Sequence, residues 1–110
     1  MSSAEAASAD PAPVFAALGD RTRLSLLMTL SDGRTRSIAT LSAQTKLTRQ
    51  AVTKHLRVLE GAGLVSSARV GRESLFVFEP ELVAEARTYL DQVSAQWDDA
   101  LSRLRSFVER

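Results

Sequence analysis

The sequence has no cysteine and only one histidine, His55, among its 110 residues. A chain without thiols cannot build a disulfide framework, a thiolate metal site or a cysteine nucleophile, and one histidine is too few for a histidine-rich zinc site. No apolar run is long enough to cross a bilayer, and residues 1–11 lack the basic-then-apolar layout of a signal peptide. We therefore expect no metal, no membrane association and a cytoplasmic location.

Groups that perform catalysis are equally scarce. The serines and threonines fall mostly at expected helix caps and turns, and no second histidine is available to complete a base-and-orienter pair. The sequence also lacks a glycine-rich phosphate loop of the Walker or dinucleotide kind. We predict that the protein is not an enzyme and uses no cofactor.

The composition is that of one ordinary globular domain. Hydrophobic residues make up 45% of the chain and charged residues 25%, which is enough apolar material for one modest core. Residues 1–11 contain almost no large apolar side chain, so we predict a flexible tail there. Residues 12–110 are predicted to form the folded domain.

The charge is distributed unevenly along the chain. Residues 34–72 hold eight basic residues and one acid, a net charge of +7, whereas the remainder carries −6. Such asymmetry within one domain indicates that the middle of the chain faces a polyanion. The alternative interpretation is a solvated surface on which the basic residues cluster by chance.

Two helices are expected before residue 33. Pro13 is suited to the first turn of a helix that Gly19 ends, and Asp20 is a suitable N-cap for a second helix over residues 21–32. The apolar side chains that we expect the second helix to bury are Leu24, Leu27 and Met28.

Two further helices follow in the basic region. Ser37 is predicted to cap a helix over residues 38–45, and Thr48 a helix over residues 49–62 that ends before Gly63. Only Lys46 and Leu47 separate the first of these helices from the cap of the second, which is the spacing of a helix-turn-helix.

The pattern then changes to that of β-strands. Residues 64–70 and 75–78 flank a tight polar turn, which predicts a hairpin, and Pro80 is suited to the start of a last long helix. The fold class is thus mainly α with a small β-hairpin, in the order α-α-α-α-β-β-α. The last helix carries apolar residues at steps of three or four, and this stripe is longer than the core of one small domain needs. We therefore expect part of it to meet a partner chain.

The helix predicted over residues 49–62 has two different faces. Val52, Leu56 and Leu59 share one side, and polar and basic residues occupy the opposite side, which suits the major groove of double-stranded DNA. Basic residues near the hairpin turn could contact the neighbouring minor groove or backbone. The predicted DNA-binding residues are Thr48, Arg49, Gln50, Thr53, Lys54, Arg57, Arg69 and Arg72.

Two motifs carry a family resemblance. Residues 18–24 (LGDRTRL) and 49–65 (RQAVTKHLRVLEGAGLV), with the hairpin after them, resemble the ArsR/SmtB-type winged-helix repressors, and the resemblance covers about residues 14–108. It implies a winged helix-turn-helix homodimer, built on the first and last helices, that represses transcription from a palindromic operator and so associates with the nucleoid. The interface would comprise Val14, Phe15, Leu18, Leu90, Val93, Trp97, Leu101, Leu104 and Val108.

The sequence departs from the metal-sensing members of that family. Those members carry cysteines in the helix that corresponds to residues 37–44, or Asp, His and Glu ligands in the last helix; this chain has no cysteine in the first and no histidine in the second. It therefore resembles the metal-free branch. Trp97 is either an anchor of the dimer interface or the floor of a pocket for an unknown small-molecule effector.

Two alternative functions stay open. The basic surface also suits a non-specific architectural DNA-binding protein, and a winged helix can serve as a protein-interaction module. His55 lies at the edge of the buried stripe of its helix, where a packed or hydrogen-bonded histidine is favoured over a ligand or pH sensor.

Overall fold

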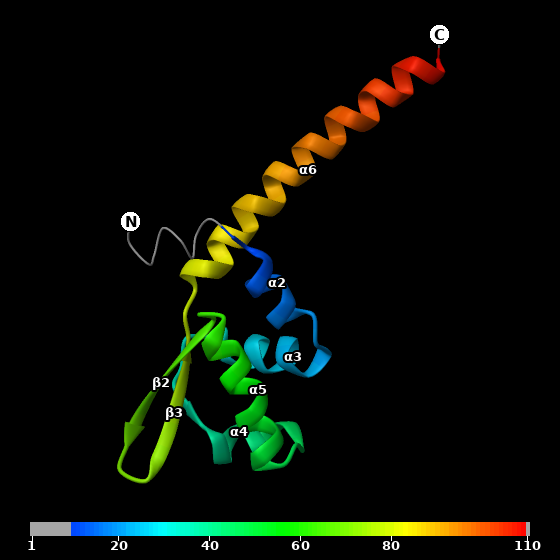
Figure 1. Ribbon diagram of the computed structural model, residues 1–110. Helices are drawn as coiled ribbons and strands as arrows, with labels where there is room; N and C mark the ends of the chain where they lie inside the picture. Colours follow the sequence, from blue (N-terminus) through cyan, green and yellow to red (C-terminus); the bar gives the residue numbers. More distant parts are fainter. Residues whose placement is uncertain (1–9, 110) are drawn as a thin grey trace.

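A computed structural model of the protein describes residues 10–109 (Figure 1). Most of the tail predicted over residues 1–11 therefore lies outside the described residues. The elements, in chain order, are α2 (Ala12–Leu18), α3 (Arg21–Leu30), β1 (Arg36–Ser37), α4 (Ile38–Thr45), α5 (Arg49–Gly61), β2 (Val65–Val70), β3 (Glu73–Phe78) and α6 (Glu81–Val108).

Three predicted N-caps are confirmed. The side chain of Asp20 accepts a hydrogen bond from the backbone N–H of Arg23, and Ser37 does the same for Thr40. Thr48 accepts from the backbone N–H of the third residue of α5. Each cap satisfies one of the backbone donors that a helix leaves free at its start, which is why α3, α4 and α5 begin at these positions.

The core lies between the helices α2 to α5 and the sheet. Its largest fully buried side chains come from every one of these elements except α2: Leu26, Leu30, Leu41, Leu56, Leu59 and Phe76, with Val52 and Leu64 beside them. The first turns of α6 contribute Ala86, while Leu82 and Val83 pack against the edge of the core.

The predicted core face of α3 is wrong in two of its three residues. Leu24 is 43% exposed and Met28 is 69% exposed, and the helix buries Leu26, Leu27 and Leu30 instead. Apolar side chains surround most of this short helix, so their spacing alone allows more than one buried face. The contacts of α3 with α2, α5 and β3 select the face that is buried.

The sheet has three antiparallel strands in the order β1-β3-β2. The predicted hairpin of β2 and β3 is confirmed, and Gly71 adopts φ 62° in its two-residue turn, as hairpin turns of this length require. The additional strand β1 was missed, and the order is therefore α-α-β-α-α-β-β-α. Two residues are too few to show an alternating pattern, and Ser37 of β1 is also the cap of α4.

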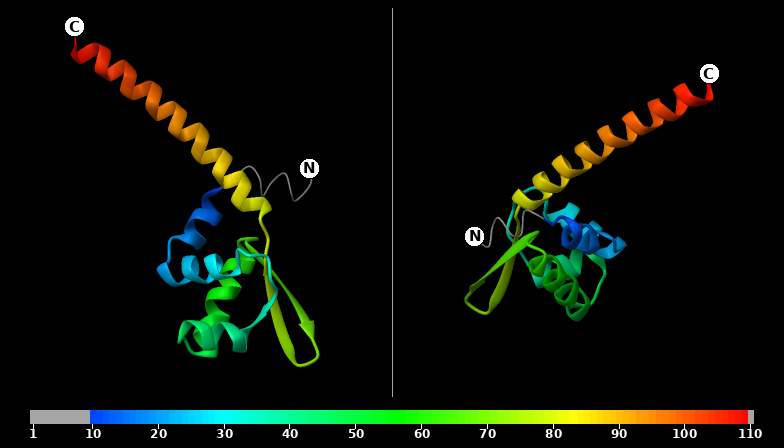
Figure 2. Two further views of the ribbon diagram at one scale, coloured as in Figure 1. Left: turned by 180° about the vertical axis from the view of Figure 1, so that it is seen from behind. Right: turned by 45° about the horizontal axis from the view of Figure 1, so that its top comes forward.

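Helix α6 runs for 28 residues, and within residues 10–109 the side chains that it packs into or against the core lie in its first turns. Figures 1 and 2 show it leaving the body at the end opposite the hairpin turn and extending as a single straight rod. Gly63 permits its close approach, because a Cβ at that position would lie 2.5 Å from Cδ1 of Leu82. None of the helices within residues 10–109 is long and apolar enough to cross a membrane.

Candidate nucleic-acid interface

The turn between α4 and α5 is tightly held. Lys46 adopts the left-handed conformation at φ 61°, and the hydroxyl of Ser42 donates a 2.5 Å hydrogen bond to the carbonyl of Leu47. Thr48 then caps α5. These contacts fix the angle between the two helices of the helix-turn-helix, so α5 is presented to solvent as a rigid element.

Helix α5 is amphipathic as predicted. Val52, Leu56 and Leu59 are completely buried, whereas Arg49, Gln50 and Lys54 are exposed on the other side. Thr53 is half-buried among them, and its hydroxyl donates a 2.7 Å hydrogen bond to the carbonyl of Arg49. The exposed face therefore presents a guanidinium, an amide and an ammonium group, which can pair with phosphates and base edges.

Arg57 differs from the other residues that were predicted to bind DNA. Its Nη1 donates a 2.7 Å hydrogen bond to Oε1 of Glu60, and its guanidinium lies 5.5 Å from the ring centroid of Phe76. The side chain is thus engaged with its own chain in a salt bridge and a cation–π contact. The sequence shows that Arg57 and Glu60 lie three residues apart on one helix. It does not show that strand β3 brings the ring of Phe76 to Arg57.

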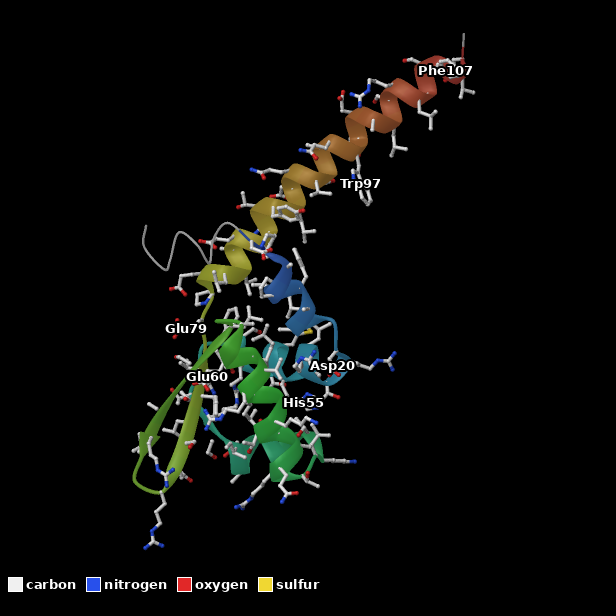
Figure 3. All side chains as sticks on the ribbon, in the orientation of Figure 1. Asp20, His55, Glu60, Glu79, Trp97 and Phe107 are labelled. Atoms are coloured by element: carbon white, nitrogen blue, oxygen red, sulfur yellow. The ribbon has the colours of Figure 1, made fainter. Side chains whose placement is uncertain are left out.

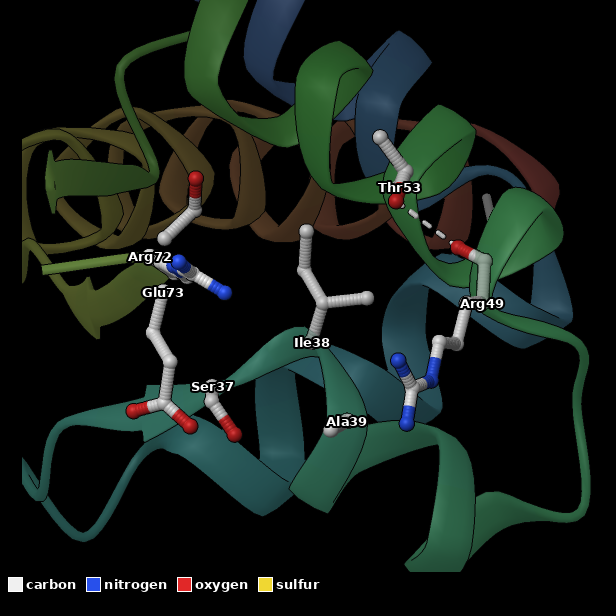
Figure 4. A pocket seen from close by; sticks show the side chains of 8 residues that line it. Ser37, Ile38, Ala39, Arg49, Thr53, Arg72 and Glu73 are labelled. Atoms are coloured by element: carbon white, nitrogen blue, oxygen red, sulfur yellow. Dashed lines mark hydrogen bonds between the residues drawn. The ribbon is translucent and has the colours of Figure 1, made fainter.

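The hairpin forms the wing and carries the other two predicted arginines. Arg72 lies in the turn and Arg69 is paired with Ser74 across the strands, and both are exposed. A cleft of about 430 Å³ separates the wing from the N-terminal ends of α4 and α5. Figure 4 shows Arg49 and Arg72 on opposite sides of it, with Ile38 between them.

The side chain of His55 extends from α5 toward the start of α3. Its Nδ1 lies 4.0 Å from Oδ1 of Asp20, and about one fifth of its side chain is exposed (Figure 3). The hydrogen bond from the backbone N–H of Arg23 lowers the pKa of Asp20, and the charge of Arg23 adds to this effect, so this carboxylate stays ionised beside the imidazole. The placement agrees with the packed histidine that the sequence favoured.

Most residues of the predicted dimer interface are accessible. Trp97 is 68% exposed, and Leu90, Leu101, Leu104 and Val108 are exposed with it along α6, whereas Val93 is half-buried. Phe15 and Leu18 of α2 are half-buried, and the Phe15 ring lies 6.1 Å from that of Tyr89. Val14 belongs to the core of the chain itself at 5% exposure, where a partner could reach little of it.

Phe107 is among the large apolar side chains on α6 that sequence reasoning missed. Phe107 is 71% exposed (Figure 3), and it follows Leu104 by three residues, just as Val93 follows Leu90. The seven-residue spacing of Leu90, Trp97 and Leu104 was therefore a signal that could have found it. Among residues 10–109, no group of three or more His, Cys, Asp or Glu side chains could hold a metal ion.

Comparison with known proteins agrees with this geometry. Residues 18–68 match a family model described as a helix-turn-helix domain. Over 74 residues the chain is 43% identical to an uncharacterized HTH-type transcriptional regulator, YuzN of Bacillus subtilis, a match that covers 62% of this chain and 80% of the relative. It is also 29% identical to the HTH-type transcriptional regulator Rv2034 of Mycobacterium tuberculosis, over 90% of this chain and 89% of that one.

Solved structures carry the same fold. An ArsR-like transcriptional regulator from Rhodococcus sp. RHA1 superposes with a TM-score of 0.76 at 35% identity, covering 90% of this chain and 92% of the other. Mb0332 from Mycobacterium bovis, described as a homodimeric winged helix-turn-helix DNA-binding domain and a possible ArsR-family regulator, gives 0.62 at 30% identity over 87% and 88%. The fold is a winged helix-turn-helix of the kind that binds DNA in transcriptional regulators. The chain belongs to the ArsR-like family of helix-turn-helix transcriptional regulators.

Proposed function

We propose that the protein is a homodimeric, sequence-specific repressor that binds a palindromic operator in its own or a neighbouring operon through the major groove. The observation that carries this proposal is the joint presentation of two basic elements. The exposed face of α5 and the wing arginine Arg72 border one cleft, with Arg49 on its far side (Figure 4). A recognition helix and a wing so placed can contact a groove and its flank at the same time.

The exposed side chains have different proposed roles. Gln50 and Lys54 lie where they can read base edges, since glutamine pairs with adenine and lysine with guanine. Thr48, Arg49 and Thr53 at the start of α5 are assigned to phosphates, which set the register of a protein on the duplex without reading sequence. Arg69 and Arg72 of the wing would contact the adjacent backbone or minor groove.

The dimer is proposed to form through α6 and α2. An apolar stripe that stays exposed over most of a 28-residue helix favours burial against a second copy, and the relative from M. bovis is described as homodimeric. The resulting two-fold axis would place two α5 helices about one helical turn of DNA apart, or a multiple of it. This seam, with Trp97 at its centre, is also where we place any small-molecule effector.

We extend the proposal to the organisation and location of the chain. Residues 12–110 act as one DNA-binding and dimerisation unit behind a tail over residues 1–11. A protein of this activity would be found in the cytoplasm, associated with the nucleoid.

A fluorescence-anisotropy titration tests the proposal. The protein is titrated against a duplex of its own upstream region and a scrambled duplex of equal length, at near-physiological salt. We expect a preference of about a thousandfold or more for the native region. Equal, steeply salt-dependent binding to both duplexes would favour the architectural alternative, and binding to neither would favour the protein-interaction module.

A further inference from the structure

A single carboxylate joins the recognition helix to the wing. Glu60 lies in the last turn of α5, where its Oε1 accepts the 2.7 Å hydrogen bond from Arg57. Its other oxygen, Oε2, accepts a 2.5 Å hydrogen bond from the hydroxyl of Ser67 in β2. Both oxygens of Glu60 are therefore occupied, one within the helix and one by the wing.

Arg57 and Glu60 contact the same cross-strand pair of the wing. Ser67, which binds Glu60, is directly opposite Phe76 in the register of β2 and β3. Phe76 is the fully buried residue whose ring lies beneath the guanidinium of Arg57. Two side chains one turn apart on α5 thus hold both members of one cross-strand pair.

This cross-strand pair lies at the base of the wing, where its contacts affect the position of the tip. The strand order β1-β3-β2 leaves β2 at the edge of the sheet, and Arg72 in the turn lies five positions beyond Ser67. At a rise of about 3.3 Å per residue, the turn lies roughly 15 Å beyond the contact. A two-stranded hairpin is marginally stable without further packing, so the angle of its tip depends on what holds its base.

The charge of Glu60 opposes DNA binding unless its contacts offset it. It is the one acid among the eight basic residues between positions 34 and 72. The hydrogen bonds from Ser67 and Arg57 lower the pKa of Glu60, so the group is ionised at neutral pH. A negative charge on this side of the protein repels phosphates, and its removal alone should therefore strengthen DNA binding.

We propose that Glu60 and Arg57 are positioning residues, which hold the wing at a fixed angle to the recognition helix so that Arg57 acts on the operator through the wing rather than by reading a base. The inference rests on the proposed function, and it names the residues that make the helix and wing one rigid DNA-binding surface. Loss of an acidic side chain alone should strengthen DNA binding. We expect the opposite for Glu60→Ala, which should weaken operator binding.

The test measures operator affinity by anisotropy for Glu60→Ala, Glu60→Gln and Glu73→Ala. Glu73 is an exposed acid at the start of β3 that lines the cleft. Its loss removes a similar charge but leaves the contacts of Glu60 with Arg57 and Ser67 in place. We expect Glu60→Ala to weaken operator binding about three- to tenfold, and Glu73→Ala to strengthen it. Glu60→Gln removes the charge but keeps two side-chain atoms that can bind Arg57 and Ser67, so it should bind the operator at least as tightly as the wild type.

A double-mutant cycle separates positioning from general damage to the fold. If Glu60 acts through the wing, its effect should shrink when Arg72 is already alanine, and it should add fully to the effect of Lys54→Ala. Arg57→Ala should also leave the salt dependence of binding unchanged, whereas loss of a phosphate contact lowers the slope by about one.

The possible failures point to different conclusions. A wild-type protein that does not prefer an operator overturns the proposed function together with this inference. If the wild type binds its operator and Glu60→Ala strengthens binding as Glu73→Ala does, the inference alone is overturned. Full additivity of Glu60→Ala with Arg72→Ala also overturns it.

Discussion

The body of the molecule and the outer half of α6 use similar apolar residues with opposite results. In the body, Leu26, Leu56 and Phe76 are completely buried within the chain. On α6, Trp97 and Phe107 are largely exposed although they recur at helical spacing. The difference separates folding from the assembly that we propose, because the body buries its core whereas nothing within residues 10–109 covers the apolar side chains on the outer half of α6.

Charged residues also differ between the body and α6. The basic residues 34–72 belong to the helix-turn-helix and the wing, whereas α6 carries a mixture of acids and arginines that pair along the helix, such as Arg103 with Asp99. The surfaces that we propose for DNA and for a partner chain are therefore on different elements. Substitutions can consequently affect one surface without the other.

The largest effect is expected in the core of the body. Leu56→Ala should lower the free energy of unfolding by about 2 to 5 kcal/mol, because it removes a fully buried side chain and leaves a cavity. Leu101→Ala on α6 is the matched control, and it should change the stability of the monomer by less than about 0.5 kcal/mol. Urea denaturation at a concentration low enough to hold both proteins as monomers measures the difference. Equal losses would remove the distinction between the two regions.

The next effect concerns assembly. Leu104→Arg should raise the dimer dissociation constant by about 30-fold or more, the equivalent of about 2 kcal/mol, while the far-UV circular dichroism of the protein stays unchanged. Ala95→Arg places the same charge on the opposite side of α6 and should leave the dimer intact. Sedimentation equilibrium distinguishes the two variants. A dimer that tolerates Leu104→Arg would show that its interface lies elsewhere.

A smaller effect is expected on the DNA-facing surface. Lys54→Ala should weaken operator binding by about 1 to 3 kcal/mol, because the exposed face of α5 loses a cation that meets a base or a phosphate. Arg87→Ala removes an exposed cation from α6 and should leave binding almost unchanged. Anisotropy titrations of both variants provide the measurement. Equal losses in the two variants would mean that net charge, not position, governs the affinity.

The smallest effect is a pH dependence within the body. The side-chain hydrogen bond from Arg36, supported by the backbone N–H of Arg34, lowers the pKa of Asp32 to about 2. A carboxyl whose pKa is lower in the folded state stabilises the fold above its unfolded pKa of 3.8, and this contribution is lost as the pH falls toward 2.

Asp32→Asn should therefore lower the urea midpoint at pH 5.5 and have little effect near pH 2. Asp99→Asn on α6 disrupts an exposed ion pair and should have little effect at either pH. A destabilisation by Asp32→Asn that is the same at both values would contradict the assignment.

The sequence was most informative where a single residue determines local geometry. Asp20, Ser37 and Thr48 revealed three helix starts through their capping chemistry, and the turn at Gly71 revealed the hairpin. The buried face of α3 could not be read in this way, since apolar residues on several sides of one helix are equivalent until other elements pack against it.

Contacts between distant elements were also beyond the sequence. The angle of Arg57 on its helix placed it with Lys54 on the groove face, and nothing in the spacing indicated that the wing would bring Ser67 and Phe76 to Glu60 and Arg57. Strand β1 was not predicted for a related reason: its two residues form a strand only because they pair with β3.

Selection of binding sites from a random duplex library, followed by sequencing, tests whether the protein recognises a specific DNA sequence. We expect enrichment of one two-fold symmetric motif, with half-sites centred about one helical turn apart or a multiple of it. The Leu104→Arg protein, selected in parallel, should enrich a single half-site weakly or nothing at all. A wild-type protein that retains DNA without enriching any sequence would contradict sequence-specific recognition by α5.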